Sequence, residues 1–166
     1  MNTPDSAITS ANAAQPTLRY QEQNATMTLD QGLKEYLGAM PDLLDYSTLE
    51  GESKELFTNH DLTHVVFGCD ISLRQEAFVD FWTMFGSDVG IRAYMRYLRT
   101  PEAQRFLQEI GVLRALWVMV LAFPAMCRVI YRALRMKKKW PWIDHAAYLD
   151  RPLADIRREL GVTIVH

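Results

Sequence analysis

The chain has 166 residues, of which 49% are apolar, and a formal net charge of -2 at neutral pH. This length and composition are typical of one globular domain, which we expect over residues 27–166. The charge argues against a dedicated nucleic-acid-binding protein, because such domains are normally basic. Cys69 and Cys127 are the only cysteines. Neither a disulfide framework nor a thiolate zinc site is therefore indicated, and a reducing compartment fits.

Residues 1–26 are rich in small and polar side chains, and we expect a disordered N-terminal tail there. They match neither a secretory signal nor a transit peptide. The longest apolar stretch, Ala115 to Cys127, has thirteen residues, whereas about 20 are needed to cross a bilayer. The sequence therefore predicts a cytoplasmic protein without a transmembrane helix, and leaves peripheral membrane contact open.

Apolar residues recur at helical spacing along most of the chain, which predicts helices rather than strands. Thr28 can cap the first helix, and the segment 100–102 (Thr-Pro-Glu) is a typical helix start. Pro124 should kink the helix that contains it, because proline lacks a backbone donor. Gly161 should end the last helix. The predicted helices cover about 28–40, 47–67, 72–85, 101–111, 115–139 and 153–160. The predicted fold class is all-α, a single helical domain.

The run HDLTH at residues 60–64 puts three potential metal ligands on one helix face. At about 100° per residue, Asp61 lies roughly 100° and His64 roughly 40° from His60. Glu76 follows twelve residues after His64, and on an unbroken helix it would lie roughly 18 Å away. A turn is therefore required, and Gly68 can provide it.

The next helix can begin just after that turn, so that Glu76 folds back toward the histidines. Asp70 or Ser72 can cap it, and Ser72 with Gln75 fits a capping box. We predict a divalent metal site between the two helices. Its ligands are predicted to be His60, Asp61, His64 and Glu76. Zinc is favoured by histidines with carboxylates, and non-haem iron also uses two histidines and one carboxylate.

An ordinary structural role for the same residues is the alternative to a metal site. His60 would then form a hydrogen bond within the core, while Asp61 and His64 would be a helix-surface pair. The sequence contains no GxSxG, GxGxxG or Walker-type motif, so serine hydrolases, Rossmann enzymes and P-loop proteins have no support. An unrelated metallohydrolase stays open.

The segment HDLTHVVFGCDISLRQE resembles the motif of the coenzyme Q biosynthesis protein 4 family, which reads HDxxH, eleven residues, then E. Every specified position matches. The closing segment KKKWPWIDHAAYLDRPLADIRRELGV is also similar to that of the family. The likeness reaches from about Thr28 to Val165, and the HDxxH and glutamate portion is its specific part.

This resemblance implies an all-helical protein of ubiquinone biosynthesis that binds a divalent metal, usually zinc. The metal would be held by the positions of His60, Asp61, His64 and Glu76. The implied reaction is oxidative decarboxylation and hydroxylation at the ring carbon that bears the carboxylate of a prenylated hydroxybenzoate. The alternative function is a non-catalytic scaffold that binds polyprenyl lipid and the other ubiquinone biosynthesis enzymes, with a structural metal.

The resemblance also implies an apolar cavity for a polyprenyl chain, and the apolar stretch before Arg128 could shelter one. The residues expected to line this lipid pocket are Trp117, Val120, Leu121 and Phe123. An ordinary core helix is the alternative. Between Arg128 and Arg158 the chain has nine basic and three acidic residues. This basic row could contact anionic lipid headgroups or be a solvated helix face. A homo-oligomer is also left open.

Overall fold

The computed structural model describes residues 18–39, 51–97, 99, 104 and 111–166. These residues are mostly helical and contain no β-strand, which confirms the predicted helical class for this part of the chain. The helix predicted at 101–111 lies largely outside it. The helical elements are η3 (Arg19–Gln21), α1 (Leu29–Ala39), α2 (Gly51–Phe67), α3 (Leu73–Gly86), α4 (Gly90–Tyr97), α6 (Val112–Leu134), η5 (Ala146–Tyr148) and α7 (Leu153–Leu160).

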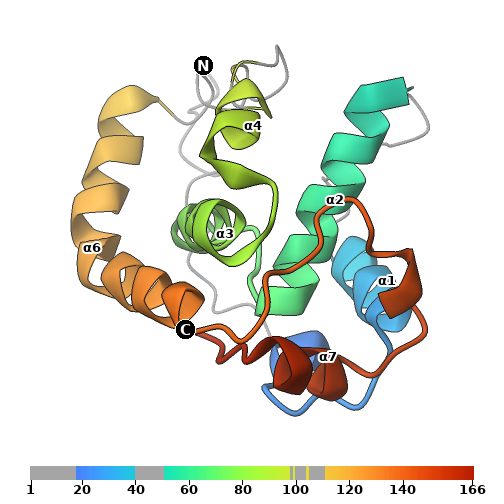
Figure 1. Cartoon of the computed structure of the whole chain (residues 1–166). Helices are drawn as coiled ribbons and strands as arrows, with labels where there is room; N and C mark the ends of the chain where they lie inside the picture. The colour runs from blue at the N-terminus through green and yellow to red at the C-terminus, as the bar shows by residue number, and fades with distance from the viewer. Residues whose placement is uncertain (1–17, 40–50, 98, 100–103, 105–110) are drawn as a thin grey trace, which may run out of the picture.

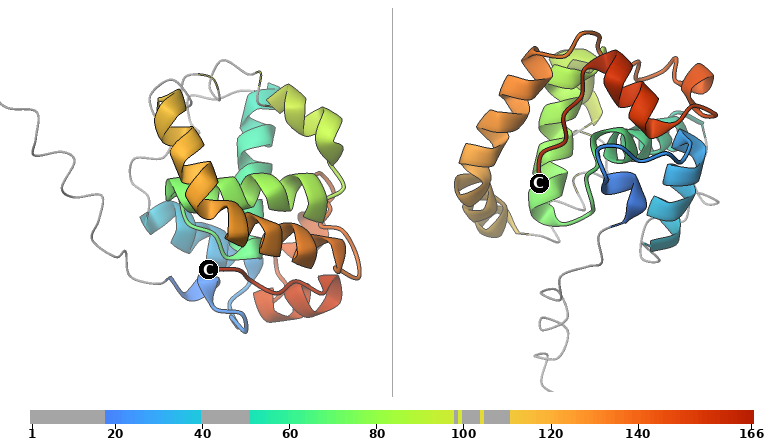
Figure 2. Two further views of the ribbon diagram at one scale, coloured as in Figure 1. Left: turned by 90° about the vertical axis from the view of Figure 1, so that its left-hand side faces the viewer. Right: turned by 90° about the horizontal axis from the view of Figure 1, so that it is seen from below.

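The helix α3 lies in the middle of the arrangement, between α6 on one side and α2 on the other (Figure 1). The helix α1 packs against the outer side of α2, and α7 lies near the C-terminal end of α2. The view from below shows the same order of α6, α3, α2 and α1 (Figure 2). Pro124 lies inside α6, and Figure 1 shows this helix bent, as expected where a backbone donor is missing.

The start of α1 is capped as the sequence predicts. The backbone N–H of Gln31 donates to Thr28 Oγ1 at 3.2 Å, and the N–H of Thr28 donates to Gln31 Oε1 at 3.0 Å. These two bonds form a capping box. The N–H of Leu29 donates to the carbonyl of Arg151 at 3.0 Å. The segment before α7 therefore holds the first turn of α1 in place.

The turn predicted at Gly68 ends α2. The N–H of Cys69 donates to the carbonyl of His64 at 2.9 Å, and that of Gly68 donates to Val65 at 3.3 Å, which is the pattern of a Schellman motif. Gly68 has a φ of +70°, and a Cβ there would lie 2.8 Å from Ile164 Cδ1. Only glycine fits this turn without strain.

The capping box predicted for α3 does not form. Ser72 is the N-cap, but its side chain makes no capping hydrogen bond. Instead, the N–H of Ser72 donates to Asp70 Oδ1 at 2.8 Å, so the aspartate orders the turn. Gln75 is buried, and its Oε1 has no hydrogen-bond partner among the described residues. The sequence pattern was right about the helix start and wrong about the bonds that stabilise it.

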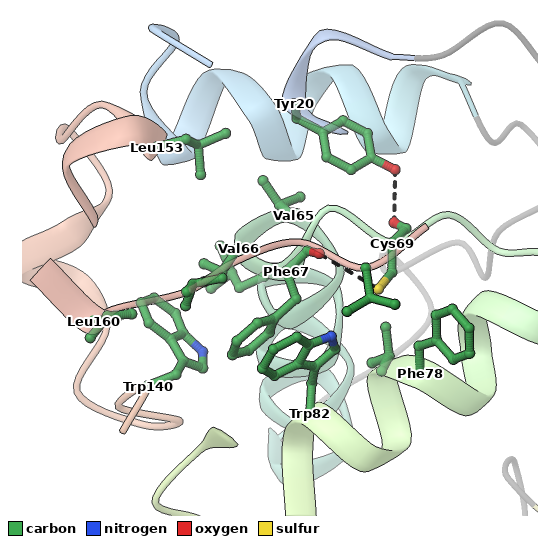
Figure 3. Packing of buried hydrophobic residues seen from close by; sticks show 14 of the residues in the cluster. Tyr20, Val65, Val66, Phe67, Cys69, Phe78, Trp82, Trp140, Leu153 and Leu160 are labelled. Carbon is green, nitrogen blue, oxygen red and sulfur yellow. Dashed lines mark hydrogen bonds between the residues drawn. The ribbon is translucent and has the colours of Figure 1, made fainter. Parts of the chain in front are cut away.

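The core lies where α2, α3 and the C-terminal segment meet (Figure 3). The rings of Phe67 and Trp82 stack with centroids 4.3 Å apart, and Trp140 is fully buried nearby. Tyr20 is also fully buried, and its hydroxyl donates to the carbonyl of Cys69 at 2.9 Å. This corrects the predicted tail at 1–26, because residues 18–26 belong to the fold. Residues 1–17 lie outside the described part.

Candidate metal centre

Two neighbouring helices supply the predicted ligands. His60, Asp61 and His64 lie in the second half of α2, and Glu76 lies in the first turn of α3. The turn at Gly68 redirects the chain between them, so that α3 packs against α2 and crosses it at a steep angle (Figure 2, left). The structure therefore brings Glu76 to the histidines, as the spacing predicts.

Three of the four predicted residues converge. Glu76 Oε1 lies 3.4 Å from His64 Nε2, and Glu76 Oε2 lies 3.9 Å from His60 Nε2. One ligand atom from each residue lies within 4.8 Å of the others. Ligand atoms that share one tetrahedral zinc ion at about 2.1 Å are about 3.4 Å apart. The three side chains could therefore hold an ion if the widest separation closed by roughly 1.4 Å.

The surroundings of His64 fit a metal ligand. Its side chain has no exposed surface, its Nδ1 has no hydrogen-bond partner among the described residues, and its Nε2 faces Glu76 Oε1 at 3.4 Å without the geometry of a good hydrogen bond. Buried polar groups are normally hydrogen-bonded, so an unsatisfied imidazole needs an explanation. Tyr36 stacks against the ring, with centroids 5.1 Å apart. A cation at Nε2 would satisfy one nitrogen, while the stacked tyrosine holds the plane of the ring.

Asp61 does not join the convergent group but lies behind His60. Asp61 Oδ1 is 3.9 Å from His60 Nδ1, whereas His60 Nε2 faces Glu76. A carboxylate on the far nitrogen of a ligating histidine fixes its orientation and raises its basicity. The structure thus favours Asp61 as an orienting residue and His60, His64 and Glu76 as the ligands.

The charges within the site attract one another. Burial lowers the pKa of His60, but the contact with Asp61 and the charge of Glu76 outweigh it, so the pKa lies above its usual value. Burial raises the pKa of Glu76, but His64 and then His60 lower it by more, so the pKa lies below its usual value. Glu76 is thus held as a carboxylate. This is the form that binds a cation.

Asp80 is an acidic neighbour of the site that the sequence analysis did not single out. It lies one turn beyond Glu76 on α3, and the hydroxyl of Tyr94 on α4 donates to Asp80 Oδ1. Burial raises the pKa of Asp80 to about 6, although Tyr94 and the two histidines act in the opposite direction. Asp80 could have been predicted from the sequence, because it lies four residues after Glu76 and this spacing places both carboxyls on one face of a helix.

The four residues expected to line a lipid pocket lie at the surface instead. Trp117, Val120, Leu121 and Phe123 on α6 are between 61% and 75% exposed. They therefore do not line an enclosed cavity, which corrects the expectation drawn from the apolar stretch. Along the described helices, none is long and apolar enough to cross a membrane.

Comparisons with known proteins found no similar sequence or structure. The chain matches no protein-family model, no curated protein and no solved structure. The similarity to the coenzyme Q biosynthesis protein 4 family therefore depends on the HDxxH and glutamate motif and on the closing segment. The geometry of His60, His64 and Glu76 is a separate observation, made without any relative.

Proposed function

We propose that this protein is a metal-dependent enzyme of ubiquinone biosynthesis, similar to the coenzyme Q biosynthesis protein 4 family. The proposed reaction replaces the carboxylate of a prenylated hydroxybenzoate with a hydroxyl group and releases carbon dioxide. This is a two-electron oxidation, and we propose dioxygen as the oxidant: the acid, dioxygen and water give the phenol, carbon dioxide and hydrogen peroxide. The observation that carries the metal site is the convergence of His60, His64 and Glu76. The choice of substrate comes from the motif resemblance.

The proposed metal is zinc, with iron as the second choice, because two imidazoles and one carboxylate suit both ions. When bound, such an ion supplies a positive charge that attracts the carboxylate of the substrate. Three protein ligands are typical of catalytic sites, whereas structural zinc normally has four. This count supports the enzyme over the alternative of a scaffold with a structural metal.

The protein residues have separate tasks in this proposal. Asp61 orients His60, and Tyr36 fixes the ring of His64. The side chain of Glu76 is 18% exposed, whereas that of His64 is completely buried. Substrate would therefore approach from the side of Glu76. Burial raises the pKa of Asp80 to about 6 in the metal-free fold, and Asp80 is the carboxyl that we propose gives or takes a proton beside the metal.

Metal analysis of the purified protein is the first test. We expect about one zinc or iron per chain, and we expect His64→Ala and Glu76→Gln to lose it. The matched control is His166→Ala, because His166 is exposed at the C-terminus and should leave the metal content unchanged. Full metal content in both site variants would refute the proposed ligands.

Turnover is the second test. The metal-loaded protein should convert a prenylated hydroxybenzoate to its hydroxylated product with release of carbon dioxide, and both site variants should lose this activity. A metal-loaded protein that binds the substrate without converting it, and that unfolds on chelation, would support the scaffold. Hydrolysis of soluble phosphoesters without lipid would instead indicate a metallohydrolase.

A further inference from the structure

The helix α6 has two apolar faces, and the part of the chain that the structure describes covers one of them. Its buried face packs against α3 and is made mostly of small residues. The buried residues are Ala122, Ala125, Met126, Val129 and Ala133. At about 100° per residue they occupy an arc of roughly 100°. These buried residues form the surface with which α6 packs against α3.

The opposite face has large apolar side chains in solvent. Six of them are between 57% and 75% exposed. These residues, which we call the outer face of α6, are Trp117, Val120, Leu121, Phe123, Tyr131 and Leu134. Counted along a regular helix they fall within an arc of about 160°, opposite the buried one. Four of them precede the bend at Pro124, and Tyr131 and Leu134 follow it. In Figure 2 (left), α6 runs along the side of the molecule that faces the viewer. Apolar patches of this kind mark a binding surface.

The segment that contains the outer face has basic residues and no acidic ones. Residues 111–143 contain seven lysines and arginines and no acidic residue. The basic residues are Arg114, Arg128, Arg132, Arg135, Lys137, Lys138 and Lys139. Arg128 and Arg135 are exposed and fall within the same arc as Trp117 and Leu121. Lys138 and Lys139 donate to Glu159 and Ala133, whereas Arg135 donates to the hydroxyl of Tyr131 within the outer face. Arg128 and Arg135 are therefore the described cations that lie beside the apolar side chains.

We propose that the outer face of α6 lies on an anionic lipid membrane. Helices that bind in the plane of a membrane surface combine an apolar face with flanking cations, and tryptophan and tyrosine favour that depth. A second copy of the chain is a poorer occupant, because two positive faces without a carboxylate between them would repel each other. This contact needs neither His60 nor Glu76, so it goes beyond the proposed reaction.

Vesicle binding by the full chain tests this contact. We expect binding to phosphatidylcholine vesicles that contain phosphatidylglycerol to exceed binding to pure phosphatidylcholine by about tenfold, and to weaken in high salt. Leu121→Glu and Leu134→Glu should each reduce it by about tenfold. Ile91→Glu is the matched control, because Ile91 is exposed on α4, away from α6, and this variant should bind as the parent does.

Tryptophan fluorescence locates the contact. Trp117 is the only exposed tryptophan of the four, since Trp82, Trp140 and Trp142 are buried. Vesicles should therefore shift the emission to the blue and protect it from aqueous quencher, and Trp117→Phe should abolish both effects. Equal binding to neutral and anionic vesicles, or unchanged binding by the α6 variants, would overturn the proposal. So would a dimer that Leu121→Glu separates without any vesicle binding. His64→Ala should bind vesicles normally, which separates this result from the metal site.

Discussion

Arg157 on α7 donates from Nε to the carbonyl oxygen of Val66 at 2.8 Å, at the C-terminal end of α2. Its Nη2 donates to the carbonyl of Val65 at 2.8 Å, and its other N–H groups reach the carbonyls of Tyr20 and Glu22. The last carbonyls of a helix lack partners within the helix, and a cation there is favoured by the helix dipole. This single buried side chain therefore ties α7 and residues 20–22 to the helix that bears the histidines.

Replacing Arg157 should destabilise the whole fold. Arg157→Met leaves several buried carbonyls without donors, and Arg157→Lys cannot reproduce the planar fork of the guanidinium. We expect each variant to lower the free energy of unfolding by about 3–5 kcal/mol. Arg158→Met is the control, because Arg158 is exposed and its ion pair is with Asp155 in the same helix, and it should cost less than about 1 kcal/mol. Urea denaturation measures the free energy of unfolding of all three variants. Equal losses for the Arg157 and Arg158 variants would contradict the role of Arg157 in joining α7 to α2.

Two glycines of α1 should respond in opposite directions to alanine. A Cβ at Gly32 would lie 2.7 Å from Val65 Cγ1, whereas a Cβ at Gly38 has open space around it. Gly32→Ala should therefore cost about 1–3 kcal/mol through overpacking. Gly38→Ala should gain up to about 1 kcal/mol, because alanine favours the helix. Thermal unfolding of both variants checks this, and a stabilised Gly32→Ala would show that α1 does not pack closely on α2.

The orienting role of Asp61 predicts a graded effect on metal binding. Asp61→Asn should keep the metal stoichiometry and weaken the affinity by about 10- to 100-fold, because the three ligands stay in place and only their support is lost. Competition with a chromogenic chelator measures this affinity. Complete loss of metal, as expected for His64→Ala, would instead make Asp61 a ligand.

The raised pKa of Asp80 predicts a pH dependence of stability in the metal-free protein. The pKa of the Asp80 carboxyl is about 6 in the folded protein and 3.8 in the unfolded chain. Below pH 3.8 this carboxyl is protonated in both states. Between pH 3.8 and 6 it is ionised in the unfolded chain but still protonated in the folded protein. The contribution of Asp80 to the free energy of unfolding should therefore fall as pH rises through this window, by on the order of 2 kcal/mol, whereas Glu76, whose pKa is lowered, contributes in the opposite direction.

Two variants isolate this contribution of Asp80. Asp80→Asn removes the titration and should flatten the fall between pH 4 and 6. Tyr94→Phe removes a hydrogen bond that favours the carboxylate, so the fall should extend to higher pH. Urea titrations with chelator present, at a series of pH values, provide the measurement. An unchanged slope in Asp80→Asn would mean that another group causes it.

Local sequence rules predicted much of the fold because local interactions decide it. Thr28 forms the predicted cap, Gly68 makes the predicted turn, and Gly161 ends α7 in the left-handed conformation. Each of these features depends on residues within one helical turn. Tyr20 was assigned to a tail because composition alone does not show that its hydroxyl reaches Cys69, 49 residues later.

The sequence by itself determined which residues could share a metal, because helical spacing and a glycine turn set the positions of His60, His64 and Glu76. Only the tertiary structure decided that Asp61 lies behind His60 and that Asp80 meets Tyr94. It also decided which face of α6 is buried. Both faces of that helix are apolar, so periodicity cannot choose between them. Small residues such as Ala122 and Ala133 let α6 approach α3 closely, and this packing leaves Trp117 and Leu121 in solvent.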